Sequence, residues 1–188
     1  MRISEVSPNT VEGSFSKDLI ISKLWLIREL KKIQPTFVTI YILGSWYGNL
    51  SLLMIDDNLG FDRIINIDTD ESVLRQSDDM AEKLGISDRI TSMCKDANLL
   101  DYRHLGGNGL VINTSCNNIK GNDWFNNIPK GTMVALQGRD TDPGSPNIFD
   151  DIDSFVKAYP LGKMLFSGKL RLKDPETNYR RFMVIGMR

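Results

Sequence analysis

Two stretches decide the fold: FVTIYILGSWYG at residues 37–48 and RIINID at residues 63–68. Each contains a run of β-branched and aromatic or aliphatic residues, which is typical of a buried strand. The first run stops at Gly44, and residues 48–58, apolar on one side, are predicted to form a short helix. A strand, a glycine-containing turn, a helix and a second strand make a βαβ unit, so the sequence predicts parallel strands at this point.

The rest of the chain continues this alternation. A helix is predicted at residues 17–32, with these apolar residues at helical spacing: Ile20, Leu24, Ile27, Leu30. Another begins at Thr69 or Asp70, with this buried face: Val73, Leu74, Ala81, Leu84. Further strands are predicted at residues 89–94, 110–113, 132–137, 163–167 and 181–185, with a brief helix near Phe155.

The last two predicted strands have no helical pattern between them, so we expect them to pair antiparallel. The preceding strands alternate with helices, which indicates right-handed crossovers. The predicted fold is therefore α/β: a three-layer, doubly wound, mostly parallel sheet of seven strands that ends in an antiparallel pair. We expect residues 1–188 to form a single domain with an N-terminal helical extension at about residues 1–35.

Composition excludes several classes of protein. Hydrophobic residues make up 41% and charged residues 25%, which is ordinary for a globular protein. The net charge of −1 gives no overall field that would attract nucleic acid or an anionic membrane. Cys94 and Cys116 are too few for a disulfide framework, and no apolar stretch approaches the roughly 18 residues of a membrane span. With no signal-peptide pattern at the N-terminus, we expect a soluble, cytoplasmic protein with reduced thiols.

The spacing of the first turn and the next acid fits a nucleotide-binding site. Backbone N–H groups at the turn after Leu43 and at the following helix N-terminus can meet a ligand. Asp68 ends the second strand about twenty residues later, where an acid accepts hydrogen bonds from ribose hydroxyls. This arrangement fits either a dinucleotide-binding fold or an S-adenosylmethionine-binding fold.

Three further features favour the second. Asp68 is followed by TDESVL (69–74), Asp96 and Ala97 stand just beyond the third strand, and the strand order ends in an antiparallel pair. With these features, residues 37–188 resemble the class I S-adenosylmethionine-dependent methyltransferases, in which an acid before a small residue contacts the adenine amino group. The resemblance implies S-adenosylmethionine as cofactor and these contacts to it: Gly44, Ser45, Trp46, Gly48, Asp68, Thr69, Asp96, Ala97. It assigns no metal ligands.

The first motif departs from the family's pattern of acid-x-Gly-x-Gly-x-Gly. The corresponding positions hold Ile42, Gly44, Trp46 and Gly48. The family's acid helps to orient the methionine amine, and its middle glycine lets the backbone approach the ligand. The turn also lacks Gly-x-Gly-x-x-Gly, which disfavours nicotinamide-dependent redox chemistry.

The end of the fourth strand is the predicted acceptor edge. Members of the family that methylate nucleobase amino groups carry Asn/Asp-Pro-Pro-aromatic here. This chain has Asn113, Thr114 and Ser115, followed by Cys116, so it keeps the Asn and lacks both prolines and the aromatic residue. The resemblance therefore assigns acceptor positioning to Asn113, Thr114 and Ser115 and argues against base methylation. Because no added recognition domain is expected, we predict a small-molecule or partner-presented acceptor.

Two other functions remain open. A non-catalytic binding or interaction protein would keep the fold while its first motif drifts. Transfer of an aminoalkyl group from the same type of cofactor, as in polyamine synthases, also uses acidic residues near the pocket.

Several residues also have a purely structural interpretation. Gly44 and Gly48 suit a turn without a ligand, Asp68 can cap a helix, and Asp96 can start an Asx-turn. Trp46 and Tyr47 can pack in the core or form a wall of the pocket, and Cys116 can be an apolar filler or a nucleophile. His104, which is near Asp101 and Tyr102, can be a surface residue or a base, and residues 140–153 can form a surface loop or a lid. The basic stretch from Leu161 can be the solvated face of a hairpin or a phosphate site; its basic residues are Lys163, Lys169, Arg171, Lys173, Arg180, Arg181 and Arg188.

Overall fold

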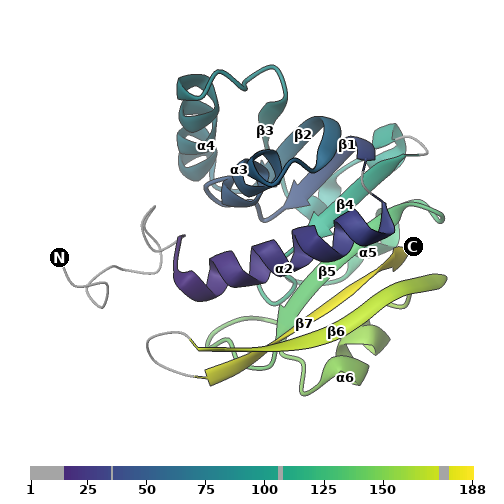
Figure 1. Cartoon of the computed structure of the whole chain (residues 1–188). Helices are drawn as coiled ribbons and strands as arrows, with labels where there is room; N and C mark the ends of the chain where they lie inside the picture. The colour runs from purple at the N-terminus through teal and green to yellow at the C-terminus, as the bar shows by residue number, and fades with distance from the viewer. Residues whose placement is uncertain (1–14, 35, 106–107, 174–177) are drawn as a thin grey trace.

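A computed structural model of the chain describes residues 15–34, 36–105, 108–173 and 178–188. Within these residues seven strands form one sheet in the order β3-β2-β1-β4-β5-β7-β6 (Figure 1). Neighbours among β1 to β5 run parallel, whereas β7 is antiparallel to both β5 and β6. The predicted fold class is confirmed. The strands are β1 Thr36–Leu43, β2 Gly60–Asp68, β3 Ile90–Cys94, β4 Gly109–Asn113, β5 Met133–Arg139, β6 Lys163–Lys173 and β7 Asn178–Met187.

Helices cover both faces of the sheet. One face carries α2 (Lys17–Ile33), α3 (Asn49–Asp56) and α4 (Glu71–Lys83), whose buried side chains share one hydrophobic cluster. The other face carries the 3₁₀ helices η2 (Ala97–Leu99) and η3 (Tyr102–Leu105), with α5 (Asp123–Asn127) and α6 (Ile152–Ala158). The molecule thus has the three predicted layers. None of the helices in the described part is long and apolar enough to cross a membrane.

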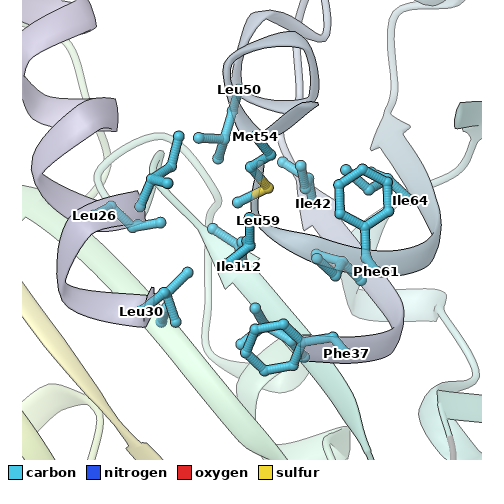
Figure 2. Packing of buried hydrophobic residues seen from close by; sticks show 14 of the residues in the cluster. Leu26, Leu30, Phe37, Ile42, Leu50, Met54, Leu59, Phe61, Ile64 and Ile112 are labelled. Carbon is cyan, nitrogen blue, oxygen red and sulfur yellow. The ribbon is translucent and has the colours of Figure 1, made fainter. Parts of the chain in front are cut away.

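Figure 2 shows how α2 and α3 close over the sheet. Leu26 and Leu30 of α2 point toward Ile112 of β4 and gather with Leu50 and Met54 of α3 in one hydrophobic cluster. Each of these side chains is almost entirely withdrawn from water. Burial of one such side chain contributes about 1.5–3 kcal/mol, so this layer is a major source of stability.

Two apolar residues of the predicted helices are exposed, and for Leu84 the predicted buried position is wrong. Leu24 of α2 is 41% exposed, because the helix turns Trp25 inward to pack edge-on against Phe166 of β6 at 5.9 Å between ring centroids. Leu84 is 62% exposed because it is the C-cap of α4, where the chain already turns toward Gly85. The predicted face of α4 otherwise holds, with Ser77 as an additional buried residue.

The sheet changes direction beside β1. The chain proceeds from β1 to β2 and β3, then returns to the other side of β1 as β4. Leu43, the last residue of β1, pairs with Ile67 of β2 and with Asn113 of β4. In such sheets ligands bind in the crevice at the carboxyl ends of the strands on either side of the reversal. The predicted cofactor turn and the predicted acceptor edge both lie at this point.

Candidate cofactor and acceptor site

The turn between β1 and α3 depends on two glycines in left-handed conformations. Gly44 has φ 59° and Gly48, the N-cap of α3, has φ 72°. A Cβ on Gly48 would lie 2.2 Å from Ser77 Oγ and 2.9 Å from Asn66 Nδ2, far inside van der Waals contact. A Cβ on Gly44 would lie 3.2 Å from Ser115 Cβ. The protein's own packing therefore requires Gly48 and leaves little room for a side chain at Gly44, whether or not a ligand also approaches them.

Trp46 also has a left-handed backbone, with φ 54°. For a residue with a Cβ this conformation costs about 1–2 kcal/mol. Its backbone N–H donates to Asp68 Oδ2 at 2.9 Å, which holds the strained residue in place. The Trp46 ring lies 5.1 Å from the ring of Tyr47; Tyr47 is buried, whereas Trp46 is partly exposed. Tyr47 thus packs into the fold, whereas Trp46 remains partly open to solvent.

Asp68 links the turn to the end of β2. Its Oδ2 accepts from Trp46, and its Oδ1 accepts from the backbone N–H of Asp70 at 3.2 Å. The cap of α4 is Asp70, whose carboxylate accepts from the N–H of Ser72 at 2.8 Å, so Asp68 is not the helix cap. An ionised carboxylate offers about four acceptor positions, so two remain on the partly exposed Asp68. Thr69 beside it is exposed.

Asp96 stands at the neighbouring strand end. Its Oδ1 accepts from the backbone N–H and the side-chain amide of Asn98, at 2.8 and 3.0 Å, so the predicted Asx-turn is confirmed and starts η2. The N–H of Lys95 donates to the carbonyl of Asp68 at 2.9 Å, which brings the ends of β2 and β3 together. Asp96 is exposed and Ala97 is buried. The carboxylate remains accessible while its backbone is fixed.

The predicted acceptor edge touches the turn. Asn113 is fully buried, and its Oδ1 accepts from the N–H of Ser115 at 2.8 Å. Ser115 Oγ donates to the carbonyl of Gly44 at 3.5 Å. Among the described residues, Asn113 Nδ2 and Ser45 Oγ are buried polar atoms that have no hydrogen-bond partner. A buried donor without a partner costs about 1–3 kcal/mol, so these two atoms are candidates for contact with a ligand.

Known structures share this architecture. No family model and no curated protein sequence matches the chain. The N-methyltransferase NodS from Bradyrhizobium japonicum WM9, in complex with S-adenosyl-L-homocysteine, has a TM-score of 0.72 at 8% identity, over 96% of this chain and 93% of that one. Magnesium protoporphyrin IX methyltransferase from Synechocystis PCC 6803, with bound SAM, has a TM-score of 0.65 at 14% identity, over 98% and 88%.

A third similar structure is geranyl diphosphate C-methyltransferase from Streptomyces coelicolor A3(2), in complex with Mg²⁺, geranyl diphosphate and S-adenosyl-L-homocysteine. Its TM-score is 0.67 at 12% identity, over 90% of this chain and 77% of that one. The chain has the class I methyltransferase fold. The three methyltransferases act on different molecules, so the likeness identifies the fold and leaves the acceptor open.

On this methyltransferase fold, hydrogen bonds hold residues 140–153 against the segment after β4 and against β7. Asn147 donates from its side-chain amide to the carbonyls of Cys116 and Ile119, at 3.0 and 2.8 Å, and Asn117 donates back to the carbonyl of Asn147 at 2.8 Å. Asp140 accepts from Arg180 Nε at 2.6 Å. The loop therefore lies against the segment that follows β4, next to the predicted acceptor edge.

Two candidate reactive residues have structural positions. Cys116 is completely buried, and burial raises the pKa of its thiol, so it is a packed apolar residue as expected. The His104 side chain is 79% exposed, with Nε2 at 3.6 Å from Asp101. Within the described ranges no group of three His, Cys, Asp or Glu side chains is placed to hold a metal ion.

Sequence reasoning missed a polar cluster beneath the start of α2. Tyr179 donates from its hydroxyl to Asp18 Oδ2 at 2.6 Å, and Ser22 exchanges hydrogen bonds with Gln137 at 2.9 and 3.1 Å. Arg181 is only 6% exposed and donates from Nη1 to the carbonyl of Thr114 at 3.3 Å.

The basic stretch was predicted to lie on the solvated face of the hairpin. This prediction is confirmed for five of its residues and is wrong for Arg181, which is buried. The exposed members are Lys163, Lys169, Arg171, Lys173 and Arg180. The signal for the missed cluster was a set of polar residues in apolar settings: Asp18 and Ser22 one helical turn apart, and Gln137 in a hydrophobic strand.

Proposed function

We propose that the chain is an S-adenosylmethionine-dependent methyltransferase that acts on a small-molecule or partner-presented acceptor. The observation that carries the proposal is the Asp68 carboxylate at the reversal of the sheet. It is fixed by two backbone N–H groups and retains acceptor positions for ribose hydroxyls. The fold and the cofactors in the similar methyltransferases support the same proposal.

The residues at the site could contact the ribose, the adenine and part of the methionine end of this cofactor. Asp68 would accept from its ribose, and Asp96 with Ala97 would border its adenine. Ser45 Oγ, buried without a partner among the described residues, would meet its methionine end. Ile42 is 2% exposed and belongs to the core, so no acid stands at that position to bind the methionine amine.

The protein's chemical task would be to position the acceptor. Bound S-adenosylmethionine supplies a methyl group already activated by its sulfonium. Asn113 to Ser115 form the facing edge, and the buried Nδ2 of Asn113 would donate to an acceptor atom. Holding the nucleophile in line with the methyl group accounts for much of the acceleration in such a reaction.

Calorimetric titration tests the proposal. Purified protein would be titrated with S-adenosylmethionine and with S-adenosylhomocysteine, in the native form and as Asp68→Ala. Asp70→Ala is the matched control, because it removes the neighbouring acid that only caps α4. We expect micromolar binding by the native and control proteins and none by Asp68→Ala. Equal binding by all three proteins would exclude the role of Asp68.

A second candidate is a non-catalytic binding protein on the same fold. Trp46 in its left-handed turn favours it, because an indole stands where the family has a glycine. Trp46→Gly separates the two candidates. If the native protein binds neither ligand and the glycine variant does, the turn has lost cofactor binding through this residue, and the non-catalytic candidate takes first place.

A further inference from the structure

Arg181 is a buried cation with unused hydrogen-bonding capacity. Its Nη1 donates to the carbonyl of Thr114 at 3.3 Å, and its buried Nε has no hydrogen-bond partner among the described residues. A guanidinium has five N–H donors in a planar fork that matches a carboxylate or a phosphate. Withdrawing it from water without an anion is costly. The position therefore calls for an anionic group.

Lys23 of α2, which is half-buried, lies near enough to Arg181 for the two positive charges to interact. Burial and the neighbouring charge of Arg181 lower the pKa of Lys23 to about 8, while Asp18 acts in the opposite direction. The carboxylate of Asp18 accepts the hydroxyl of Tyr179, and Asp142 is paired with Arg139. Over the described ranges, neither Lys23 nor Arg181 forms an ion pair. Among the described residues, the carboxylate that acts on Lys23 is therefore that of Asp18, which already accepts from Tyr179.

The cluster lies beside the acceptor edge and next to a surface depression. Thr114, which accepts from Arg181, is a predicted acceptor residue. The ring of Tyr179 lies 5.1 Å from the guanidinium of Arg139 and 5.7 Å from that of Arg181. Tyr179 also lines a wide, open depression of roughly 660 Å³, which Arg181 and Lys23 do not line and whose charged residues are Asp140, Arg171, Lys173 and Arg180. This lining favours the approach of an anion.

We propose that Arg181 and Lys23 bind an anionic group, a carboxylate or a phosphate, of a small acceptor and so hold that acceptor against residues 113–115. The proposal rests on the methyltransferase function above and names its substrate class. Arg181 would form the directional hydrogen bonds, and Lys23 would add a second positive charge. Both are positioning and specificity residues, since neither is assigned to the reacting atoms.

The test uses inorganic phosphate and acetate as probes at constant ionic strength. The pKa of Lys23 would be followed by NMR of its ε-carbon, with Lys23→Met to assign the signal. A bound anion stabilises the ammonium form, so we expect the pKa to rise from about 8 as the probe saturates. The probe that binds more tightly distinguishes a phosphate site from a carboxylate site.

Two variants and one control locate the site. We expect Arg181→Gln and Lys23→Met to weaken calorimetric binding of the better probe by about tenfold or more, because each removes a charged partner. Arg75→Gln, which removes an arginine whose side chain is 73% exposed on α4, should bind as the native protein does. If Arg181→Gln does not fold, Lys23→Met decides the question, since the Lys23 side chain takes no part in the buried hydrogen bonds that Asp18 and Ser22 form with Tyr179 and Gln137.

The outcomes separate this inference from the proposed function. Binding of S-adenosylhomocysteine with no response of Lys23 to either anion would overturn the anion site alone. Anion binding that depends on Arg181, without any S-adenosylhomocysteine binding, would support the anion site and contradict the methyltransferase function. Equal anion binding by the native protein and both variants would also overturn the site.

Discussion

The two halves of the carboxyl edge are built differently. The proposed cofactor half, at the ends of β1, β2 and β3, is held by contacts between residues fairly close in the chain, such as Asp96 to Asn98, two residues apart, and Trp46 to Asp68, 22 residues apart. The acceptor half, at the ends of β4, β5 and β7 with the start of α2, is held by long-range contacts. Asp18 and Tyr179 are 161 residues apart in the chain. A motif can be recognised from local spacing in the first half, whereas the second exists only after folding.

The strongest test of the cofactor half is Gly48→Ala. The new Cβ would collide with Ser77 and Asn66, and the left-handed backbone would add strain, so we expect a loss of about 3 kcal/mol in the free energy of unfolding. Urea unfolding measures this loss. Gly85→Ala is the control, because Gly85 has φ 67° but open space around it. Equal losses in the two variants would show that close packing does not fix the turn.

The corresponding change in the acceptor half is Tyr179→Phe. It removes the hydroxyl that donates to the carboxylate of Asp18, a residue only 7% exposed. We expect a loss of about 2 kcal/mol in unfolding free energy, because a buried acceptor is left without its partner. Tyr159→Phe provides the comparison, since its hydroxyl lies 3.5 Å from the carbonyl of Cys116 and makes a weaker bond. A loss for Tyr179→Phe no greater than that for Tyr159→Phe would count against a tightly held cluster.

A smaller effect is expected from Asp96→Ala in the cofactor half. The variant removes the Asx-turn that starts η2 but buries no new group, so about 1 kcal/mol of stability should be lost. Asp79→Ala, on the exposed face of α4, should have almost no effect. Thermal unfolding of both variants checks this prediction, and an unchanged midpoint for Asp96→Ala would mean that η2 is held by its buried residues alone.

The smallest effect concerns pH and Lys23 in the acceptor half. Its pKa is about 8 in the folded protein and 10.5 at its ordinary value. Between these values the unfolded chain binds the proton and the folded chain does not, so the stability contributed at this site rises with pH. Relative to Lys23→Met, the native protein should gain ~0.5 kcal/mol per pH unit in this window. Parallel pH profiles for the two proteins would contradict the lowered pKa of Lys23.

Much of the fold could be predicted because its signals are local. The run at residues 37–43, the turn at Gly44 and the acid at Asp68 each depend on nearby residues, and the structure contains the β1–α3–β2 unit that they predict. The antiparallel ending was predictable because no helical pattern separates β6 from β7. The 3₁₀ helices were missed since each is short and depends on a single turn, as at Asp96.

The acceptor half could be predicted only in part. Asn113 to Ser115 were predicted as acceptor residues because they stand at the end of a recognisable strand. Arg181 was grouped with its exposed basic neighbours, because the composition of a hairpin does not tell which of its basic residues point toward the protein interior. Only its register opposite Arg139, at the end of β5, brings it to the acceptor edge. Such a placement depends on the pairing of distant strands, which residue spacing does not encode.

The position of β7 also affects the order of assembly. This strand follows β6 in the chain, yet it lies between β5 and β6 and pairs with both. Until residues 178–187 leave the ribosome, β5 has an open edge and β6 has no neighbour in the sheet. The nascent chain can pair β1, β2, β3 and β4 earlier. The acceptor half must therefore form last, and a chain interrupted before β7 would expose a strand edge prone to aggregation.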